Sequence, residues 1–118
     1  MHELGVVFHI VNGIEDVAKQ NAVNKVVKTT LEIGEVSTFV IDYFRDCWNW
    51  AINKSDILRG SELEIETIPA VTFCENCNKT YPTVRYGKIC PHCGSDKTYL
   101  KQGNEVNIKQ IVVPDSAD

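Results

Sequence analysis

The sequence predicts an α+β fold in which two helices pack on a small three-stranded mixed sheet, with an inserted segment that contains four cysteines. Two stretches repeat apolar residues at helical spacing, and three stretches alternate apolar and polar residues as strands do. Two Cys-x-x-Cys pairs interrupt the chain before the last of these strands. With 118 residues, the chain can form one ordinary core and a small appendage.

The first helix is predicted from about residue 4 to the low twenties. Its apolar side chains form one stripe, which must be buried against another element. The stripe comprises Leu4, Val7, Phe8, Val11, Ile14 and Ala18. His9 lies on the same helix, and we expect it to be a surface residue.

Residues 25–34 alternate and predict a half-buried strand. One side of this strand carries Val27, Thr29, Leu31 and Ile33. A second amphipathic helix is expected over residues 37–54, with Ser37 as its N-cap. Cys47 lies on the apolar side of that helix, so we expect it to be buried as a small hydrophobic residue.

Residues 61–68 alternate again and predict a strand with an acidic outer face, which Pro69 ends. Residues 105–113 predict the last strand. The first two strands are expected to be parallel if they are neighbours, because a helix connects them. The predicted domains are therefore an α/β domain of residues 1–69 plus 104–114 and a zinc-ribbon domain of residues 70–103.

Composition restricts the functional classes. The net charge of −4 argues against broad binding to nucleic acid or to anionic membranes, since such binding depends on Lys and Arg. No apolar run approaches the roughly 20 residues of a membrane helix, and the N-terminus does not resemble a secretion signal. We expect a cytoplasmic protein.

The four paired cysteines, Cys74, Cys77, Cys90 and Cys93, predict a structural zinc site. Each pair can direct two sulfurs to one side of a tight turn, and the residues between the pairs are expected to form a hairpin that closes the tetrahedron. Gly94 supplies permissive backbone after the second pair. A site with four thiolates leaves no open position for catalysis.

Other features of the ribbon leave alternatives open. His92 lies inside the second pair and is either a competing ligand or, as we expect, an exposed loop residue. The ribbon is mildly basic and contains tyrosines, which favours either a stacking platform for single-stranded nucleic acid or packing around the small core. These basic and aromatic residues are Lys79, Arg85, Lys88, Lys97, Lys101, Tyr81, Tyr86 and Tyr99.

The first three residues, Met1, His2 and Glu3, offer a second metal site. The α-amine, the backbone nitrogen of His2 and its imidazole can form fused chelate rings around one cation. Glu3 adds an oxygen or its amide nitrogen. Such a nitrogen-rich, nearly planar donor set favours Ni(II) or Cu(II). We expect Met1 to be retained, because His2 is too bulky for efficient removal of the initiator methionine.

The chain resembles the HypA/HybF family of hydrogenase maturation nickel metallochaperones over essentially its full length. The segments that carry the resemblance are MHELG at the start, LEIGEVS at 31–37, ELEIETIP at 62–69, CENC and CPHCGS in the ribbon, and QGNEVNIKQIVV near the end. The resemblance implies that Met1, His2 and Glu3 bind nickel, with His2 indispensable, and that the four paired cysteines hold structural zinc.

The resemblance also implies two partners, a GTPase accessory protein and the large subunit of a nickel-iron hydrogenase. Some relatives also serve urease maturation. One departure concerns Val40, where family members often carry an acidic residue near the nickel site. We expect a non-enzymatic carrier, either a monomer or a weak homodimer, with no nucleic-acid or membrane partner. The alternative is a zinc-ribbon module that binds nucleic acid or adapts proteins to one another.

Overall fold

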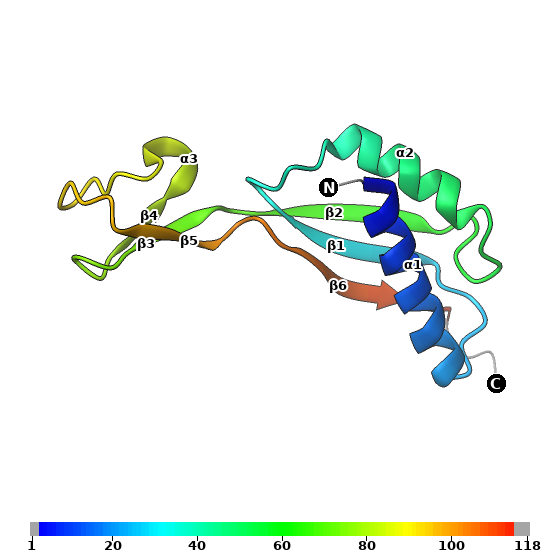
Figure 1. The fold of residues 1–118 in the computed structure, drawn as a ribbon. Helices are drawn as coiled ribbons and strands as arrows, with labels where there is room; N and C mark the ends of the chain where they lie inside the picture. The colour runs from blue at the N-terminus through cyan, green and yellow to red at the C-terminus, as the bar shows by residue number, and fades with distance from the viewer. Residues whose placement is uncertain (1–2, 115–118) are drawn as a thin grey trace. The chain divides into compact units, whose positions relative to one another are not determined.

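The computed structural model describes residues 3–114 of the chain. Its elements follow the predicted order of helix, strand, helix, strand, ribbon and strand (Figure 1). They are α1 (Glu3–Gln20), β1 (Lys28–Gly34), α2 (Ile41–Ile52), β2 (Glu62–Ile68), β3 (Val71–Cys74), β4 (Thr80–Pro82), α3 (Thr83–Tyr86), β5 (Thr98–Gln102) and β6 (Val106–Val112).

The described chain divides into two compact units. The helical unit contains residues 3–31, 38–65 and 108–114, and the ribbon unit contains residues 32–37 and 66–107. The domain boundaries expected from the sequence, 1–69 plus 104–114 and 70–103, stay a prediction.

β1 is the central strand of a three-stranded sheet with the order β2-β1-β6. The N–H of Glu62 donates to the carbonyl of Val27 (2.9 Å), and the N–H of Glu35 donates to the carbonyl of Ile68 (2.8 Å). The start of β1 thus lies beside the start of β2, and the two ends also coincide. β1 and β2 are therefore parallel neighbours, as predicted.

β6 runs in the opposite direction along the other edge of β1. The N–H of Val27 donates to the carbonyl of Val112, and the N–H of Gly34 donates to the carbonyl of Glu105, both at 2.8 Å. The start of one strand therefore lies beside the end of the other. The sheet is mixed, and the predicted α+β class is confirmed.

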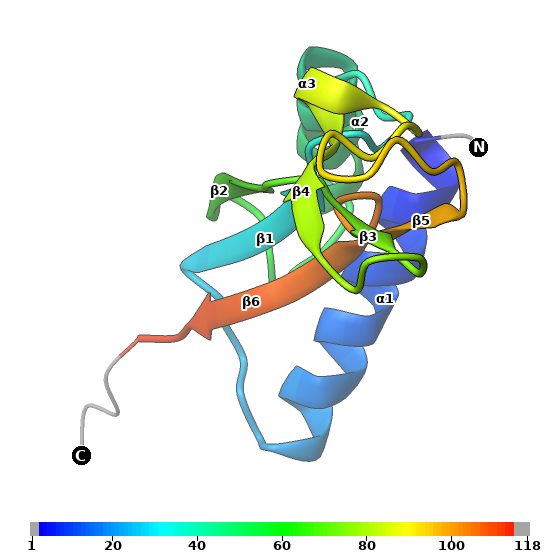
Figure 2. The same ribbon diagram turned by 90° about the vertical axis from the view of Figure 1, so that its left-hand side faces the viewer.

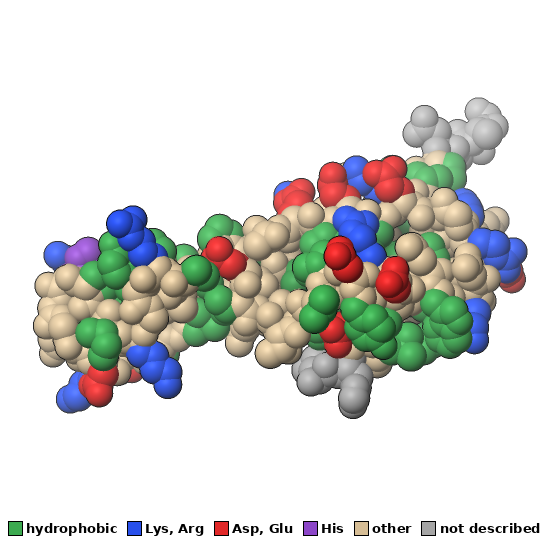
Figure 3. Space-filling view, turned by 90° about the horizontal axis from the view of Figure 1, so that it is seen from above, with side chains coloured by type: hydrophobic (Ala, Val, Ile, Leu, Met, Phe, Trp, Pro, Cys, Tyr) green, Lys and Arg blue, Asp and Glu red, His purple; other side chains and the backbone are tan. Residues whose placement is uncertain are grey.

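α1 and α2 contact each other and cover the same face of this sheet (Figures 1 and 2). The buried helix side chains are Val7, Ile10, Val11, Ile14, Ala18, Phe44, Cys47, Trp48, Ala51 and Ile52. They pack over Leu31 and Leu63 of the sheet, which are also buried. Burial of each large side chain contributes about 1.5–3 kcal/mol. The predicted burial of Cys47 is confirmed. On the outer surface, charged side chains of both signs lie among hydrophobic ones (Figure 3).

The start of α2 differs from the prediction. The helix begins at Ile41, and its N-cap is Val40 without a side-chain hydrogen bond. Ser37 does not cap the helix, because its N–H closes the turn after β1 by donating to the carbonyl of Gly34 (3.0 Å). Val27 was also expected on the buried side, but it precedes β1 and is exposed.

The outer face of the sheet is less exposed than its sequence suggests. Thr30 alternates with Thr29 and Leu31 and so falls on the opposite side of β1, yet its side chain is buried and its hydroxyl donates to Glu64 of β2 (3.2 Å). The Lys28 ammonium lies 3.6 Å from the same carboxyl group. Polar side chains of the neighbouring parallel strand therefore cover Thr30.

The ribbon unit contains a second sheet with the order β4-β3-β5, in which β3 pairs antiparallel with both neighbours. Its small core consists of Cys74, Tyr81 and Cys90, with Cys77 packed against them. The hairpin expected between the two cysteine pairs is wrong. That segment contains β4 and α3, and β4 pairs instead with β3, which ends at Cys74 of the first pair.

Candidate metal centre

The two cysteine pairs lie in turns with the same backbone hydrogen bonds. In the first turn, the N–H of Asn78 donates to the carbonyl of Cys74 (2.8 Å), and the N–H of Cys74 donates to the carbonyl of Lys79 (2.9 Å). The second turn repeats this pattern. The N–H of Gly94 donates to the carbonyl of Cys90 (2.8 Å), and the N–H of Cys90 donates to the carbonyl of Ser95 (2.9 Å).

Both turns require a residue with positive φ directly after the second cysteine. Gly94 has φ 77° and Asn78 has φ 60°. Glycine adopts this conformation freely, and asparagine does so more readily than most other residues. The role of Gly94 was predicted, but that of Asn78 was not, although asparagine after a cysteine pair is a usable signal.

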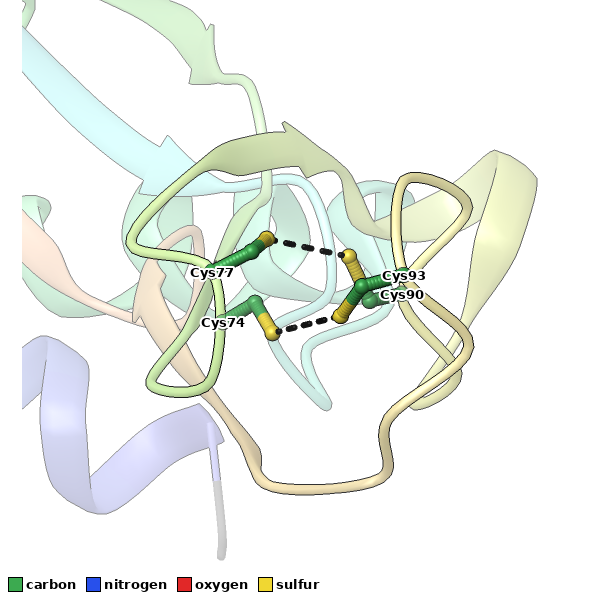
Figure 4. Close-up of side chains that lie close together, drawn as sticks. All are labelled: Cys74, Cys77, Cys90 and Cys93. Carbon is green, nitrogen blue, oxygen red and sulfur yellow. Dashed lines mark hydrogen bonds between the residues drawn. The ribbon is translucent and has the colours of Figure 1, made fainter.

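These turns bring four sulfur atoms together (Figure 4). The Sγ atoms of Cys74 and Cys93 are 3.6 Å apart, those of Cys77 and Cys90 are 3.7 Å apart, and all four lie within 4.8 Å of one another. A tetrahedral zinc ion with Zn–S bonds of about 2.3 Å would separate its sulfur ligands by about 3.8 Å. The donor set and its spacing therefore fit such an ion.

The four thiols differ in their electrostatic surroundings. The Asn76 side-chain amide donates to the Cys93 sulfur (3.4 Å) and, with the backbone near Ser95, lowers the pKa of Cys93 to about 6. Burial, reinforced by hydrogen bonding with Cys90, raises the pKa of Cys77 to about 11. Cys93 is consequently a thiolate at neutral pH and can attract an incoming cation, whereas Cys77 must lose a proton when the metal binds. Sequence reasoning missed Asn76.

The cysteine cluster is the one group of three or more potential metal-ligating side chains that the structure brings together within residues 3–114. His92 is exposed, as expected, and its backbone N–H donates to the Cys90 sulfur (3.4 Å). The arrangement therefore forms a closed site with four sulfur ligands, suited to holding a metal for structural purposes.

The ribbon tyrosines take two roles. Tyr81 is buried in the core, and its hydroxyl donates to the carbonyl of Gly87 (2.8 Å). Tyr86 and Tyr99 are exposed, but each ring also packs against a neighbour, Tyr81 and Phe73 respectively. Tyr81 therefore packs in the small core of the ribbon, which is one of the two roles predicted for these tyrosines, whereas Tyr86 and Tyr99 also remain accessible to a partner.

The predicted nickel-binding residues are only partly visible, because Met1 and His2 lie outside the described residues. Glu3 begins α1, and its Oε2 atom accepts a hydrogen bond from the backbone N–H of Val40 (3.2 Å). His9 is exposed on α1, as expected. Among the described helices, none is long and apolar enough to cross a membrane.

The fold and this site define a small α+β metal-binding protein with a closed four-thiolate centre in a ribbon. A family model described as "Hydrogenase/urease nickel incorporation, metallochaperone, hypA" matches residues 1–113. The chain therefore belongs to the HypA family of nickel-incorporation metallochaperones, which act in hydrogenase maturation.

Similar proteins match along nearly their whole length. The hydrogenase maturation factor HypA of Azoarcus sp. (strain BH72) is 29% identical over 115 residues, which cover 98% of this chain and 100% of the relative. HypA of Actinobacillus succinogenes is 30% identical over 113 residues, with 96% and 99% covered. The solution structure of the Ni metallochaperone HypA from Helicobacter pylori has the same fold, with a TM-score of 0.75, 24% identity, and coverage of 96% of this chain and 97% of that one.

Proposed function

We propose that the chain captures Ni(II) through Met1, His2 and Glu3 and transfers it by ligand exchange to an acceptor in hydrogenase maturation. The observation that carries this proposal is the separation of roles. The four-cysteine cluster is closed and fits a permanent zinc ion, so a transferable ion needs another donor set. The terminal Met-His-Glu sequence supplies nitrogen donors of the kind that Ni(II) favours.

The surroundings of Glu3 support this assignment. The hydrogen bond that its carboxylate accepts from Val40 ties the first turn of α1 to the residue before α2. Hydrogen bonding with Cys47 and the negative charge of Glu3 raise the pKa of Tyr43. Glu3, the described member of the proposed site, is therefore close enough to the Tyr43 phenol for its negative charge to act there, and that charge suits a cation.

A groove beside this position suits an acceptor protein. It is lined by Leu4, Tyr43, Asp46, Cys47 and Trp50, and is predominantly apolar. Phe8 packs edge-on against Trp50 with ring centroids 5.7 Å apart. Partly exposed aromatic side chains are frequent anchors of protein interfaces. We assign this groove to the GTPase accessory protein or to the hydrogenase large subunit, whichever receives the nickel directly.

Nickel titration of the untagged chain tests the capture step. Isothermal titration should give a single nickel equivalent, and His2→Ala should abolish it. His9→Ala is the matched control, because His9 is exposed on the same helix and should not affect binding. Unchanged nickel binding by His2→Ala would contradict the proposed site.

Metal analysis tests the division between the two sites. The purified chain should contain zinc before nickel loading, and His2→Ala should keep that zinc. Cys93→Ala should lose zinc, because one of the four clustered sulfur ligands is removed. If nickel bound only to the cysteine cluster, the separate delivery site would be wrong.

A further inference from the structure

Residues 83–89, which comprise α3 and the turn after it, expose apolar side chains on the ribbon unit; we call this segment the ribbon face. Val84 is 65% exposed, Ile89 is 53% exposed and Tyr86 is 41% exposed. Hydrophobic and Lys or Arg side chains lie beside one another on this unit (Figure 3). Adjacent exposed apolar side chains commonly mark a contact surface.

The ribbon face also carries positive charge that no carboxylate of the described residues neutralises. Its charged residues are Arg85 and Lys88, and it contains no Asp or Glu. Among residues 3–114, neither cation has a carboxylate partner within salt-bridge distance. The Arg85 guanidinium instead lies 5.4 Å from the centre of the Tyr86 ring. Both cations are therefore available to carboxylates of another molecule.

Hydrogen bonds hold the backbone of the ribbon face in place. The N–H of Gly87 donates to the carbonyl of Thr83 (2.7 Å), and the Tyr81 hydroxyl donates to the carbonyl of Gly87 (2.8 Å). The Thr98 hydroxyl donates to the carbonyl of Lys88 (2.7 Å). A surface that is already ordered loses little conformational entropy when a partner binds.

We propose that the ribbon face binds an acidic segment of a partner protein that also carries apolar side chains. Carboxylates pair with Arg85 and Lys88, and apolar side chains pack on Val84 and Ile89. A single-stranded nucleic acid fits less well. The Arg85 guanidinium lies over the Tyr86 ring, and Tyr81 packs edge-on against that ring with centroids 6.0 Å apart, so part of the surface on which a base would stack is already occupied.

A random-peptide library displayed on phage, selected on the full chain loaded with metal, tests this surface. The selected peptides should be enriched in both acidic and apolar residues. Fluorescence anisotropy then measures the affinity of a selected peptide for the parent chain and for each variant. Arg85→Glu with Lys88→Glu tests the charges, and Val84→Ser with Ile89→Ser tests the apolar side chains. The matched control is Lys97→Glu with Lys101→Glu, which changes the same charge elsewhere in the ribbon unit.

Each variant pair in the ribbon face should weaken peptide binding by about tenfold or more, and the control pair by less than about threefold. Equal losses in the control would overturn the proposal, as they would indicate unspecific charge attraction. Selected peptides without acidic residues, or tighter binding of an oligothymidylate, would also overturn it. A further result would also overturn it. If Arg85→Glu with Lys88→Glu released the bound metal, and the same variant reloaded with metal bound the peptide as tightly as the parent chain, the two cations would serve the thiolate centre and not a partner. Nickel titration of the same variants should be unchanged, which separates this surface from the nickel site.

Discussion

The backbone of Gly34 approaches that of Gly103 so closely that a Cβ atom on Gly34 would lie 2.0 Å from the Gly103 carbonyl oxygen. The same oxygen accepts a hydrogen bond from the N–H of Val36 (2.8 Å). Gly103 itself has φ 121° and packs against Ala70. The two glycines are thus required where the turn after β1 meets the end of β5.

Gly34→Ala should lower the free energy of unfolding by about 1–3 kcal/mol, since the methyl group forces backbone atoms apart. Chemical denaturation monitored by circular dichroism measures this change. Gly13→Ala is the control, because in the middle of α1 its Cβ would meet no atom within 4 Å apart from its chain neighbours and the nearby backbone of the helix itself. That substitution should stabilise the helix by about 0.8–1 kcal/mol. Equal stability of Gly34→Ala and the parent chain would contradict the close approach.

Asn78→Val should weaken metal binding, because a β-branched side chain disfavours the left-handed conformation by about 1–2 kcal/mol. Asn78→Gly should retain the affinity, as Gly94 does in the equivalent turn. Competition with a chromophoric chelator measures both. Lys79→Val is the control, since Lys79 follows directly and is not among the described residues with positive φ. A loss as large in Lys79→Val would show that the conformation of Asn78 is not the cause.

Removal of the metal by a chelator should unfold the ribbon unit before the helical unit. Cysteines that contribute to the sulfur cluster form most of the ribbon core, in which Tyr81 is the one aromatic residue. Without metal, the core loses the bonds that join its two turns. Hydrogen exchange should accelerate in β3, β4 and β5 and remain slow in the buried turns of α1 and α2. Retained protection of β3 would show that the ribbon is stable without metal.

The pH dependence of metal affinity should differ between Cys77→Ser and Cys93→Ser. Metal binding requires thiolates, so every protonated thiol contributes a released proton. Because the pKa of Cys77 is raised to about 11, it releases a proton at neutral pH, whereas Cys93, with its pKa lowered to about 6, is already ionised.

Between about pH 7 and 8, the slope of log affinity against pH should therefore fall by about one in Cys77→Ser and stay unchanged in Cys93→Ser. Cys93 contributes to the pH dependence of metal affinity only as the pH falls through about 6, where its thiolate takes up a proton and the affinity decreases. Asn76→Ala removes the amide donor to Cys93 and should move this loss to higher pH. Identical slopes in the two cysteine variants would refute this difference in ionisation.

Val40→Ser should stabilise the chain by about 1 kcal/mol, since Val40 is the N-cap of α2 and lacks a capping hydrogen bond. Its side chain is 62% exposed, so little packing is lost. Val40→Asp also offers a cap, but its charge lies near Glu3, which accepts a hydrogen bond from the Val40 N–H. Val40→Asp should therefore gain less stability than Val40→Ser and bind nickel more tightly. Thermal unfolding and calorimetry measure these effects, and a Val40→Ala variant provides the uncapped reference.

The sequence by itself determined the order of the elements, the mixed sheet and the four sulfur ligands. These features depend on local periodicity and spacing: apolar stripes mark the helices, alternation marks the strands, and paired cysteines mark the turns that bind metal. The resemblance of ordered motifs added the nickel-carrier family, which the match over residues 1–113 confirms. The pairing of Met1 and His2 with nickel remains a prediction.

Tertiary structure alone decided the contacts between residues that are distant in the sequence. Gly34 beside Gly103, Glu3 beside Val40 and Asn76 beside Cys93 leave no periodic signal, because each contact depends on how the elements come together. The same is true of the late start of α2, where the turn after β1 uses the backbone of Ser37. Local periodicity and spacing therefore determined which segments form helices and strands and which four sulfur atoms can hold a metal. Packing decided where a backbone position permits no side chain and which thiol has the lowest pKa.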